Sequence, residues 1–407
     1  MGIHLMSARA IANTASGETD WQRPGDNPLA GGHGGPICLP SATESGKSRM
    51  ARASALPMDE GGADATGAEL PASHPALPPE RVGVVLMNLG TPDATDYWSM
   101  RRYLSEFLSD RRVIDYPVWL WQPLLQLVIL SRRPASKGRD YASIWNKERD
   151  ESPLKTVTRS QAEKLAARLE RRSPRLVVDW AMRYGNPSVK SVLDRLVAQG
   201  CTRLLLMALY PQYAAPTTAT AYDKAFDALK QIRWQPAVRT LPPYHDHPGY
   251  IAALADKIER HLAGLDWTPD LLVFSYHGMP KRLLTSGDPY HCHCQKTTRL
   301  VRERLGLPAD KVMVCFQSRF GSEEWLQPYL DQTMGELPGR GVRRVAVVSP
   351  AFVTDCLETL EEIQGENREI FEHAGGERFA YIPCLNDDEA HIVLLEELAL
   401  GELQGWW

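Results

Sequence analysis

From residue 81 onward, the hydrophobic and polar residues follow two alternating patterns. Short aliphatic runs of strand length recur, and stretches with apolar residues every three or four positions, such as 160–172 and 191–200, lie between them. Strands that alternate with helices build βαβ units, so the pattern predicts parallel β-sheet. The predicted strands are 82–90, 176–185, 202–213, 237–244, 271–278, 311–321, 343–353 and 378–385.

These eight strands form two sets of four, which predicts an α/β protein with two similar Rossmann-like, doubly wound domains, each around a parallel four-stranded sheet. We place the domains at 80–248 and 249–407 and expect the C-terminal helix to pack back on the first. Residues 1–79 are rich in Gly, Ala, Ser and Pro and are predicted to be a disordered extension. Because Met50 and Met58 lie in it, the true start of translation stays open.

Composition narrows the possible functions only slightly. The 407 residues are 43% hydrophobic and carry a net charge of -4, which gives no electrostatic reason to expect nucleic acid as a partner. Seven cysteines occur without a recognisable secretory signal, which favours a reducing compartment and predicts a cytoplasmic location.

Unusual side chains occur where the predicted strands end. Arg183 and Tyr184 end the second strand, Tyr210 and Tyr213 the third, and His277 the fifth. Ligands of doubly wound sheets bind at the carboxyl ends of strands, and two domains create a cleft. A single histidine at such a place is more often a structural, hydrogen-bonded residue, but several polar strand ends together favour a site.

An acidic stripe follows the seventh strand. Glu358, Glu362 and Glu366 are spaced four residues apart, and like charges at this spacing destabilise an α-helix. One interpretation is a solvated face, partly compensated by Arg368. The other is a carboxylate track that attracts a divalent cation or carries protons, and with His277 facing it the pair would suit a transiently held metal ion.

Eight short motifs between residues 82 and 395 occur in the order and spacing of one family. They are LMNLGTPD, YLSEFLSDRRVID, ESPLK, MRYGNPS, LYPQYAAPTTAT, SYHGMPKR, FQSRFGSEEWLQPY and DCLETLEEI. The chain thereby resembles the ferrochelatases, lyases that insert ferrous iron into protoporphyrin IX to make protoheme in the last step of heme biosynthesis. The resemblance implies a porphyrin cleft between two Rossmann-like domains, Fe²⁺ and protoporphyrin IX as substrates, and no required cofactor.

The resemblance also implies roles for individual residues. His277 and Glu358 match the family's catalytic and metal-handling pair on opposite walls of the cleft, and which of them delivers the metal stays open. Asp355, Glu362 and Glu366 match the rest of the acidic track. Cys356 stands where some members carry a second histidine, which weakens any metal-relay role there. The implied porphyrin-binding residues are Leu89, Arg133, Tyr141, Ser152, Arg183, Tyr184, Tyr210 and Tyr213.

The longest apolar run is 116–134. Its core of about 14 residues is too short to span a bilayer. Trp119 and Trp121 at one end and Arg132 and Arg133 at the other are typical of an interfacial segment, so we expect peripheral contact with the inner face of the membrane. In the family this segment is the lip of the porphyrin cleft, where the two arginines can pair with propionates. The alternative is a buried helix with a charged terminus.

His291, Cys292, His293 and Cys294 suggest a metal site at first sight. We expect these residues in an extended loop, where neighbouring side chains point in opposite directions and cannot close one tetrahedral site. A [2Fe-2S] cluster that joins Cys292 and Cys294 with Cys201 or Cys384 stays as an alternative.

Two other functions are compatible with the resemblance. The chain could insert cobalt or nickel, or accept coproporphyrin, although the Trp- and Leu-rich lip favours the less carboxylated protoporphyrin. It could also be a porphyrin or heme carrier on a chelatase fold. The presence of both His277 and Glu358 argues against a carrier, which does not need opposed proton-handling groups.

Overall fold

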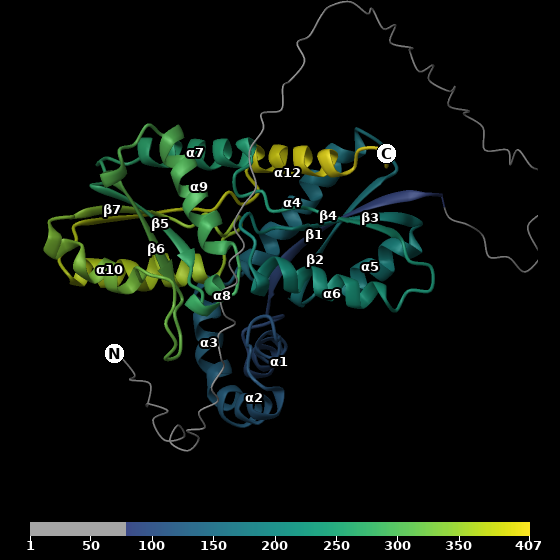
Figure 1. Ribbon diagram of the computed structural model, residues 1–407, viewed down its shortest axis with the longest axis horizontal. Helices are drawn as coiled ribbons and strands as arrows, with labels where there is room; N and C mark the ends of the chain where they lie inside the picture. The colour runs from purple at the N-terminus through teal and green to yellow at the C-terminus, as the bar shows by residue number, and fades with distance from the viewer. Residues whose placement is uncertain (1–78) are drawn as a thin grey trace, which may run out of the picture. The chain divides into compact units, whose positions relative to one another are not determined.

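The computed structural model describes residues 79–407, so the predicted extension over 1–79 lies almost wholly outside the described residues. Within the described part, eight strands form two parallel four-stranded sheets with the matching orders β2-β1-β3-β4 and β6-β5-β7-β8 (Figure 1). The predicted fold class and all eight predicted strands are confirmed. The strands are β1 Arg81–Thr91, β2 Leu176–Gly185, β3 Cys201–Ala208, β4 Ala237–Thr240, β5 Leu271–His277, β6 Val312–Gln317, β7 Arg344–Val348 and β8 Arg378–Ile382.

Five strands, β3, β4, β6, β7 and β8, end at least three residues earlier than the sequence pattern predicts. β3 and β7 stop before Pro211 and Pro350, because proline lacks the N–H group that a neighbouring strand would require. β6 stops at Gln317, because the next residue, Ser318, has a left-handed backbone with φ 65°. Beyond β3 and β7 the apolar run continues into a loop outside the sheet.

Helices connect the strands, and several begin at a side chain that caps them. Asp96, Ser152 and Ser188 each accept a hydrogen bond from a backbone N–H of the first turn of the helix that follows. The α-helices are α1 Tyr97–Leu108, α2 Val118–Leu124, α3 Leu130–Ile144, α4 Pro153–Glu170, α5 Val189–Ala198, α6 Thr220–Leu229, α7 Pro248–Ala263, α8 Lys281–Thr285, α9 Tyr290–Arg304, α10 Leu330–Glu336, α11 Arg368–His373 and α12 Glu389–Glu402. Wider π-helical turns occupy Leu125–Ile129, Ala215–Ala219 and Glu358–Asn367, and short 3₁₀ turns occupy Ala309–Lys311 and Pro338–Arg340.

One apolar core extends across both sheets. Side chains alternate along a strand, so Val84 of β1 faces this core while Val85 faces the opposite layer with α5 and α6. The same core continues through Leu165 of α4, Leu254 of α7 and Leu395 of α12 to the inner face of the second sheet. Figure 1 shows α7 on the side of the second sheet and α12 on the side of the first, both along the same edge of the molecule.

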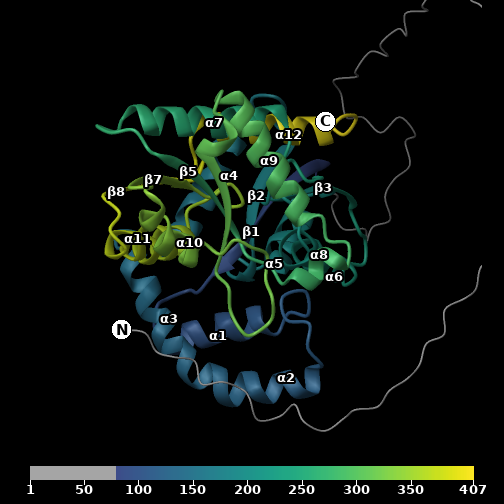
Figure 2. The ribbon, with the colours of Figure 1, turned by 60° about the vertical axis from the view of Figure 1, so that its left-hand side comes forward.

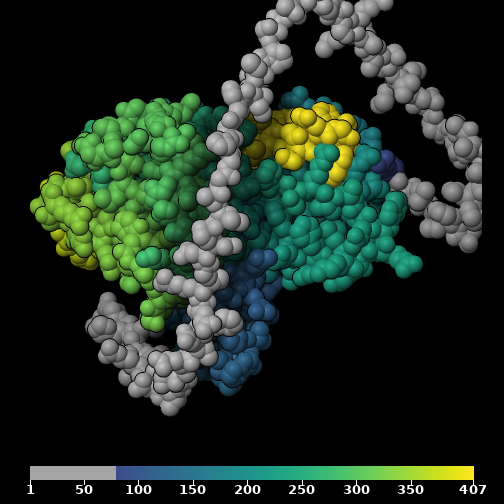
Figure 3. Space-filling model, viewed as in Figure 1, coloured from purple at the N-terminus to yellow at the C-terminus, as the bar shows by residue number. Residues whose placement is uncertain are grey.

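The segment between β1 and β2 forms its own layer. Figures 1 and 2 both show α1, α2 and α3 together on the side opposite α7 and α12. Met100, Leu104, Leu125 and Leu130 of this segment are buried in a separate cluster, which also contains Leu357 from beyond β7. In Figure 3 the α1–α3 segment, drawn in blue, projects from the rest of the molecule.

Polar contacts join the first and last elements of the described region. Arg168 of α4 and Arg172, which lies just beyond the end of α4, donate to the two carboxylate oxygens of Glu396 on α12, at 2.7 and 2.9 Å. Arg203 of β3 lies 3.4 Å from the Glu80 carboxylate and donates to the backbone oxygen of Trp406 at 3.1 Å. Residues near both ends of the described region, Glu80 and Trp406, therefore contact the same arginine.

Candidate functional site

His277 is the last residue of β5 and is partly exposed. Its Nδ1 lies 2.7 Å from the carbonyl oxygen of Gly278. A carbonyl oxygen can only accept a hydrogen bond, so Nδ1 carries the proton and Nε2 of the neutral ring keeps its lone pair. The backbone thus fixes a tautomer in which Nε2 can accept a proton or bind a metal ion.

Gly278 allows the strand to turn at this point. A Cβ atom there would lie 2.6 Å from the carbonyl oxygen of Gln317 and 3.1 Å from the Trp325 ring. The Gly278 N–H donates to the same carbonyl oxygen at 2.7 Å. Any larger residue would push β6 away, so the glycine keeps the ends of β5 and β6 in contact beside His277.

Two residues of β6 and its loop hold the acidic segment, and the sequence analysis assigned neither of them a role. Gln317 accepts from Ser275 at 2.5 Å and donates to the backbone oxygen of Glu358 at 2.8 Å. Ser318 donates to the Glu362 carboxylate from its N–H at 2.6 Å and from its hydroxyl at 2.5 Å. Their place at the carboxyl end of a strand, next to His277 in the sheet register, was the signal that could have found them.

The acidic segment is a π-helix over Glu358–Asn367 and not the α-helix that the four-residue spacing predicts. Glu358 and Glu362 are partly buried, whereas Glu366 is exposed. Burial raises the pKa of Glu362 above its ordinary value; the Ser318 hydroxyl and His277 oppose this shift, and the Glu358 charge adds to it. Gln317 is opposite His277 in the sheet register and donates to the backbone oxygen of Glu358, so the acidic segment begins beside His277.

Asp355 lies at the start of this segment but is fully engaged. Its carboxylate accepts hydrogen bonds from the side chains of Tyr381, Thr359 and Asn386, the last at 2.6 Å. It also accepts from the backbone N–H of Cys384 at 3.3 Å. Asp355 is only 7% exposed, and its carboxylate oxygens accept hydrogen bonds from these neighbours. It therefore holds the backbone in place where the chain enters the π-helix.

A small pocket brings four predicted site residues together. Leu89, Tyr141, Ser152 and Glu358 all line it, and Cys356 lies beside them. Burial, and then the Glu358 charge, raises the pKa of Cys356 well above its ordinary value, so this residue is a neutral thiol. We name this cavity the carboxylate pocket.

The remaining predicted porphyrin-binding residues lie outside the lining of the carboxylate pocket. Tyr184 is fully buried in the cluster of α1 and α3 and donates to Asp110, which also pairs with Arg183. Arg133 of α3 is exposed, although nearby protein atoms still lower the pKa of its guanidinium by desolvation. The structure therefore does not gather all eight residues around one cavity.

The two tyrosines that follow β3 differ in their surroundings. Within the described residues, the Tyr210 hydroxyl is buried without a hydrogen-bond partner. Tyr213 is partly exposed, and its backbone N–H donates to Nδ1 of His293 at 3.2 Å. An unpaired buried hydroxyl is costly, which makes Tyr210 the more notable of the two.

The segment 116–134 presents apolar side chains at the surface. None of the α2 residues is buried, and Trp119 and Leu127 are 74% and 76% exposed. The buried-helix interpretation of this segment is therefore wrong for α2: Trp121 packs against the cluster of α1 and α3, but Trp119, Leu120 and Leu124 are exposed. We call the exposed set the lip; it comprises Tyr116, Val118, Trp119, Leu120, Leu124, Leu127 and Val128. Within the described part of the chain, no helix is long and apolar enough to cross a membrane.

The histidine and cysteine run lies in the first turn of α9, so the extended loop predicted for it is wrong. The side chains spread around the helix: Cys292 is exposed, and Cys294 is fully buried beside Tyr290. Among residues 79–407, no group of three His, Cys, Asp or Glu side chains has the geometry of a metal site. Cys201 and Cys384 are buried thiols in other parts of the core.

Comparison with known proteins shows the family. Residues 81–403 match the Ferrochelatase family model. The ferrochelatase of Rhodobacter capsulatus is 62% identical over 338 residues, which are 83% of this chain and 96% of that protein. The ferrochelatase of Agrobacterium fabrum is 58% identical over 83% of this chain and 98% of that protein. Among solved structures, SirB from Bacillus subtilis matches 80% of this chain and 98% of its own, with 13% identity and a TM-score of 0.47. The chain belongs to the ferrochelatase family.

Proposed function

We propose that the protein inserts ferrous iron into protoporphyrin IX to form protoheme, with release of the two pyrrole protons. Membership of the family supports this reaction. The observation that carries it is the carboxylate pocket, where Glu358 shares one wall with Leu89 and Tyr141. Apolar and aromatic side chains suit a flat macrocycle, and a carboxylate beside them suits the removal of protons from its centre.

His277 and Glu358 form the proposed catalytic and metal-handling pair. The lone pair on Nε2 of His277 can accept a pyrrole proton or present the metal ion, and the Glu358 carboxylate can perform the complementary step. Burial supports an outward path for protons, because exposure rises from Glu362 to Glu366. The saturated hydrogen bonds of Asp355 support a positioning role at the inner end of this acidic track.

The eight proposed porphyrin-binding residues are supported by different observations. Leu89, Tyr141 and Ser152 share the pocket with Glu358. Arg133 presents an exposed guanidinium that can pair with a propionate. For Arg183, Tyr184, Tyr210 and Tyr213, the support is their position at or just after the carboxyl ends of β2 and β3, and Tyr184 also belongs to the α1 and α3 cluster.

The lip is proposed to contact the membrane surface. Its exposed apolar side chains, with Arg132 and Arg133 at its end, match a segment that lies in the headgroup region. Such contact would place the protein at the inner face of the membrane, where apolar porphyrin can enter the cleft. We also propose that residues 80–248 and 249–407 form the two domains, each around one of the sheets.

We infer that iron enters as a substrate and that no resident cofactor is required. The test is chemical analysis of anaerobically purified protein for iron and acid-labile sulfide. Stoichiometric sulfide would restore the [2Fe-2S] alternative with Cys292 and Cys294.

The decisive experiment uses protoporphyrin IX and zinc, which avoids the oxidation of ferrous iron. The protein should form zinc porphyrin, followed by its shifted fluorescence, far faster than free solution does. His277→Ala should abolish insertion yet bind porphyrin with little loss, because affinity comes mainly from burial of the ring. His373→Ala, which changes an exposed histidine of α11, serves as the matched control and should insert zinc like the parent protein.

Three outcomes would change the assignment. If His277→Ala unfolds or loses porphyrin, the histidine is structural. If it keeps full activity, the proton acceptor must be sought among the other candidates, and the catalytic role fails. If the parent protein binds porphyrin without inserting any metal, the carrier function replaces the enzyme. Competition between protoporphyrin and coproporphyrin, and between Fe²⁺, Co²⁺ and Ni²⁺, separates the chelatase specificities.

A further inference from the structure

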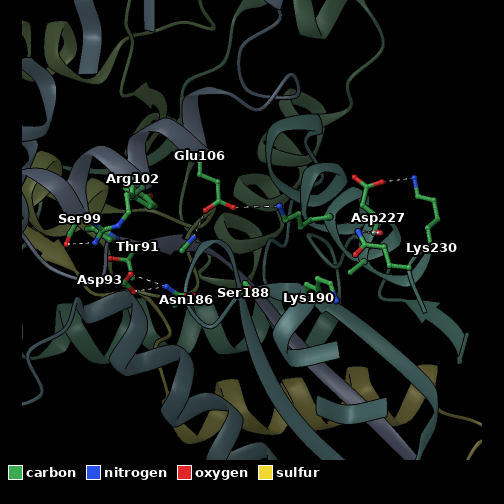
Figure 4. A pocket seen from close by; sticks show the side chains of 16 residues that line it. Thr91, Asp93, Ser99, Arg102, Glu106, Asn186, Ser188, Lys190, Asp227 and Lys230 are labelled. Carbon is green, nitrogen blue, oxygen red and sulfur yellow. Dashed lines mark hydrogen bonds and ion pairs between the residues drawn. The ribbon is translucent and has the colours of Figure 1, made fainter. Parts of the chain in front are cut away.

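A second cavity lies at the carboxyl ends of β1 and β2. It has a volume of about 780 Å³ and is walled by the strand ends, by α1, by the start of α5 and by α6. Figure 4 shows its side chains, with Arg102 and Glu106 on one wall and Ser188 and Lys190 on another. This size is within the range of roughly 300 to 1,000 Å³ that small-molecule sites occupy.

The cavity is separate from the proposed reaction site. It shares no lining residue with the carboxylate pocket. The two are neighbours, because Thr91 lines the cavity while Gly90 lines the pocket, and because Tyr103 of the cavity packs edge-on against Tyr141 of the pocket at 6.3 Å. Neither His277 nor Glu358 lines this cavity, so the proposed catalytic pair lies outside it.

Basic side chains outnumber acidic ones in the lining, although the whole chain carries a net charge of -4. The basic residues are Arg102, Lys190, Lys224 and Lys230, and the acidic residues are Asp93, Glu106 and Asp227. An adjoining surface hollow shares Arg102, Glu106 and Lys224 and adds Arg101, Arg183 and Asp110, of which the last two form an ion pair. The excess of positive charge is therefore continuous over both hollows.

The acidic side chains are largely committed to other donors. Asp93 accepts from the Asn186 amide at 3.0 and 3.2 Å, and Glu106 accepts from the backbone N–H of Gly185 at 3.0 Å. By contrast, Arg102 donates to the hydroxyl of Ser99 and has no carboxylate partner among residues 79–407. Lys224 lies 3.8 Å from Glu106, which is too long for a good hydrogen bond. Donors on α1 and α6 thus remain available to a ligand.

The amino terminus of α5 contributes to the same cavity. Ser188 caps this ten-residue helix, and Ser188 and Lys190 both line the wall. The first backbone N–H groups of a helix point outward from its end and favour an anion, as does the helix dipole. Lys190 and Lys230 pair with exposed acids near them in sequence, Asp194 and Asp227, at 2.6 Å, and such exposed pairs are weak and exchangeable.

We propose that this cavity binds a small organic or inorganic polyanion that carries at least two phosphate or carboxylate groups. The cationic groups belong to three separate elements, α1, α5 and α6, so a single negative group cannot meet them all. Two or more linked oxyanion groups can span Arg102 and Lys224 on one side and the start of α5 on the other.

Titration calorimetry of the full-length protein, without porphyrin or metal, tests the site. Pyrophosphate represents the phosphate ligands and citrate the carboxylate ligands, each in dilute metal-free buffer. We expect saturable binding of one molecule of at least one of them, weakened by added sodium chloride because the contacts are ionic. Whichever anion binds more tightly identifies the ligand class.

Two opposite variants and a control sharpen the test. The double substitution Arg102→Gln with Lys224→Gln should weaken binding by at least about tenfold, because it removes two charge-assisted donors. Asp227→Asn should strengthen binding several-fold, because it frees Lys230 and removes a negative charge from the wall. Arg299→Gln with Arg304→Gln, on the exposed face of α9, removes the same charge elsewhere and should change nothing.

The proposal is overturned if neither anion binds saturably at millimolar concentration. It is also overturned if the α9 control loses as much affinity as the cavity variant, since binding would then reflect total charge alone. If circular dichroism shows that the cavity double variant does not fold, Asp227→Asn becomes the deciding variant. The proposal is then overturned if Asp227→Asn does not bind the anion more tightly than the parent protein.

Discussion

Ser318 has a backbone φ of 65°, a conformation that residues other than glycine rarely adopt and that costs of order 1 kcal/mol. This backbone conformation directs both the N–H and the hydroxyl of Ser318 at the Glu362 carboxylate. A partly buried carboxylate that keeps two donors can stay ionised near a cation.

Glu362→Gln is expected to raise the apparent KM for the metal about three- to tenfold and to change the turnover number less, because one charge leaves the track that concentrates cations. Zinc insertion measured over a range of metal concentrations checks this. Glu377→Gln, an exposed carboxylate before β8, is the control. If the apparent KM for the metal does not change, the result favours the interpretation that these carboxylates only form a solvated face.

His391 makes stability depend on pH. Burial lowers its pKa from 6.5 to about 4, and its Nδ1 lies 2.6 Å from the carbonyl oxygen of Asn386, which also holds Asp355. The folded state keeps the ring neutral, while the unfolded chain binds a proton below pH 6.5. The stability contribution is therefore complete above pH 6.5 and is lost as pH falls toward 4, by roughly 3 kcal/mol in total.

The corresponding experiment is urea unfolding of His391→Gln between pH 7.5 and 4. The variant should be less stable than the parent protein at pH 7.5, and this gap should narrow by roughly 3 kcal/mol at pH 4, because glutamine does not titrate. His373→Gln, at the surface, should follow the parent at every pH. A gap that stays constant would show that His391 titrates alike in both states.

At this scale the sequence predicted part of the candidate site. His277 was found because it ends an apolar strand, and Glu358 because of the acidic spacing. Gln317 was missed because a buried glutamine at a strand end looks ordinary without its partners Ser275 and Glu358. The left-handed backbone of Ser318 comes from packing between β6 and the π-helix, which no local pattern encodes.

At the scale of the element, the π-helix Glu358–Asn367 shows where sequence periodicity fails. A four-residue spacing fits an α-helix and a π-helix almost equally, because both return to nearly the same face after four residues. Asn367 contributes to the wider turn by donating to the backbone oxygen of Glu362 at 2.8 Å. π-Helical turns are common at functional sites, and here the turn carries the proposed proton path.

The lip offers an element-scale prediction. Trp119→Ser with Leu120→Ser should lower affinity for phospholipid vesicles at least tenfold, because two apolar side chains would no longer enter the bilayer surface. Turnover at saturating porphyrin should change little. Phe226→Ser with Trp234→Ser removes two exposed aromatic side chains elsewhere and should leave vesicle binding intact. A fall in turnover number alone, with vesicle binding unchanged, would contradict the proposed role of the lip.

At the scale of the whole molecule, the common core and the contact of α12 with α4 couple the two sheets. Glu396→Gln should destabilise the protein by about 1–3 kcal/mol, because Arg168 and Arg172 would lose the charge that they share. Glu397→Gln, an exposed neighbour on α12, is the control and should cost little. Tryptophan fluorescence and circular dichroism should report one coincident unfolding transition in both variants, whereas separate transitions would show that the sheets unfold independently.

The fold was predictable at this scale because each parallel strand, covered by helices on both faces, reads as an aliphatic run. The order of the strands within each sheet could not be predicted, because pairing between strands that are distant in the sequence produces no local sequence pattern. The α1–α3 layer could not be predicted either: Leu125 and Leu130 are buried while their neighbours Leu124 and Leu127 are exposed, a division set by which side meets α1.

Glu80 and Trp406 both contact the Arg203 side chain. This contact suggests that the protein tolerates circular permutation. Ends that lie this close can be joined by a short glycine-rich linker, and new termini can open in the exposed turn between Leu265 and Asp266, which separates α7 from β5. A circular permutant that runs from Asp266 to Trp407 and then from Glu80 to Leu265 should fold to the same structure and insert zinc at a similar rate. The order in which the ribosome makes the two sheets is then immaterial to the finished protein.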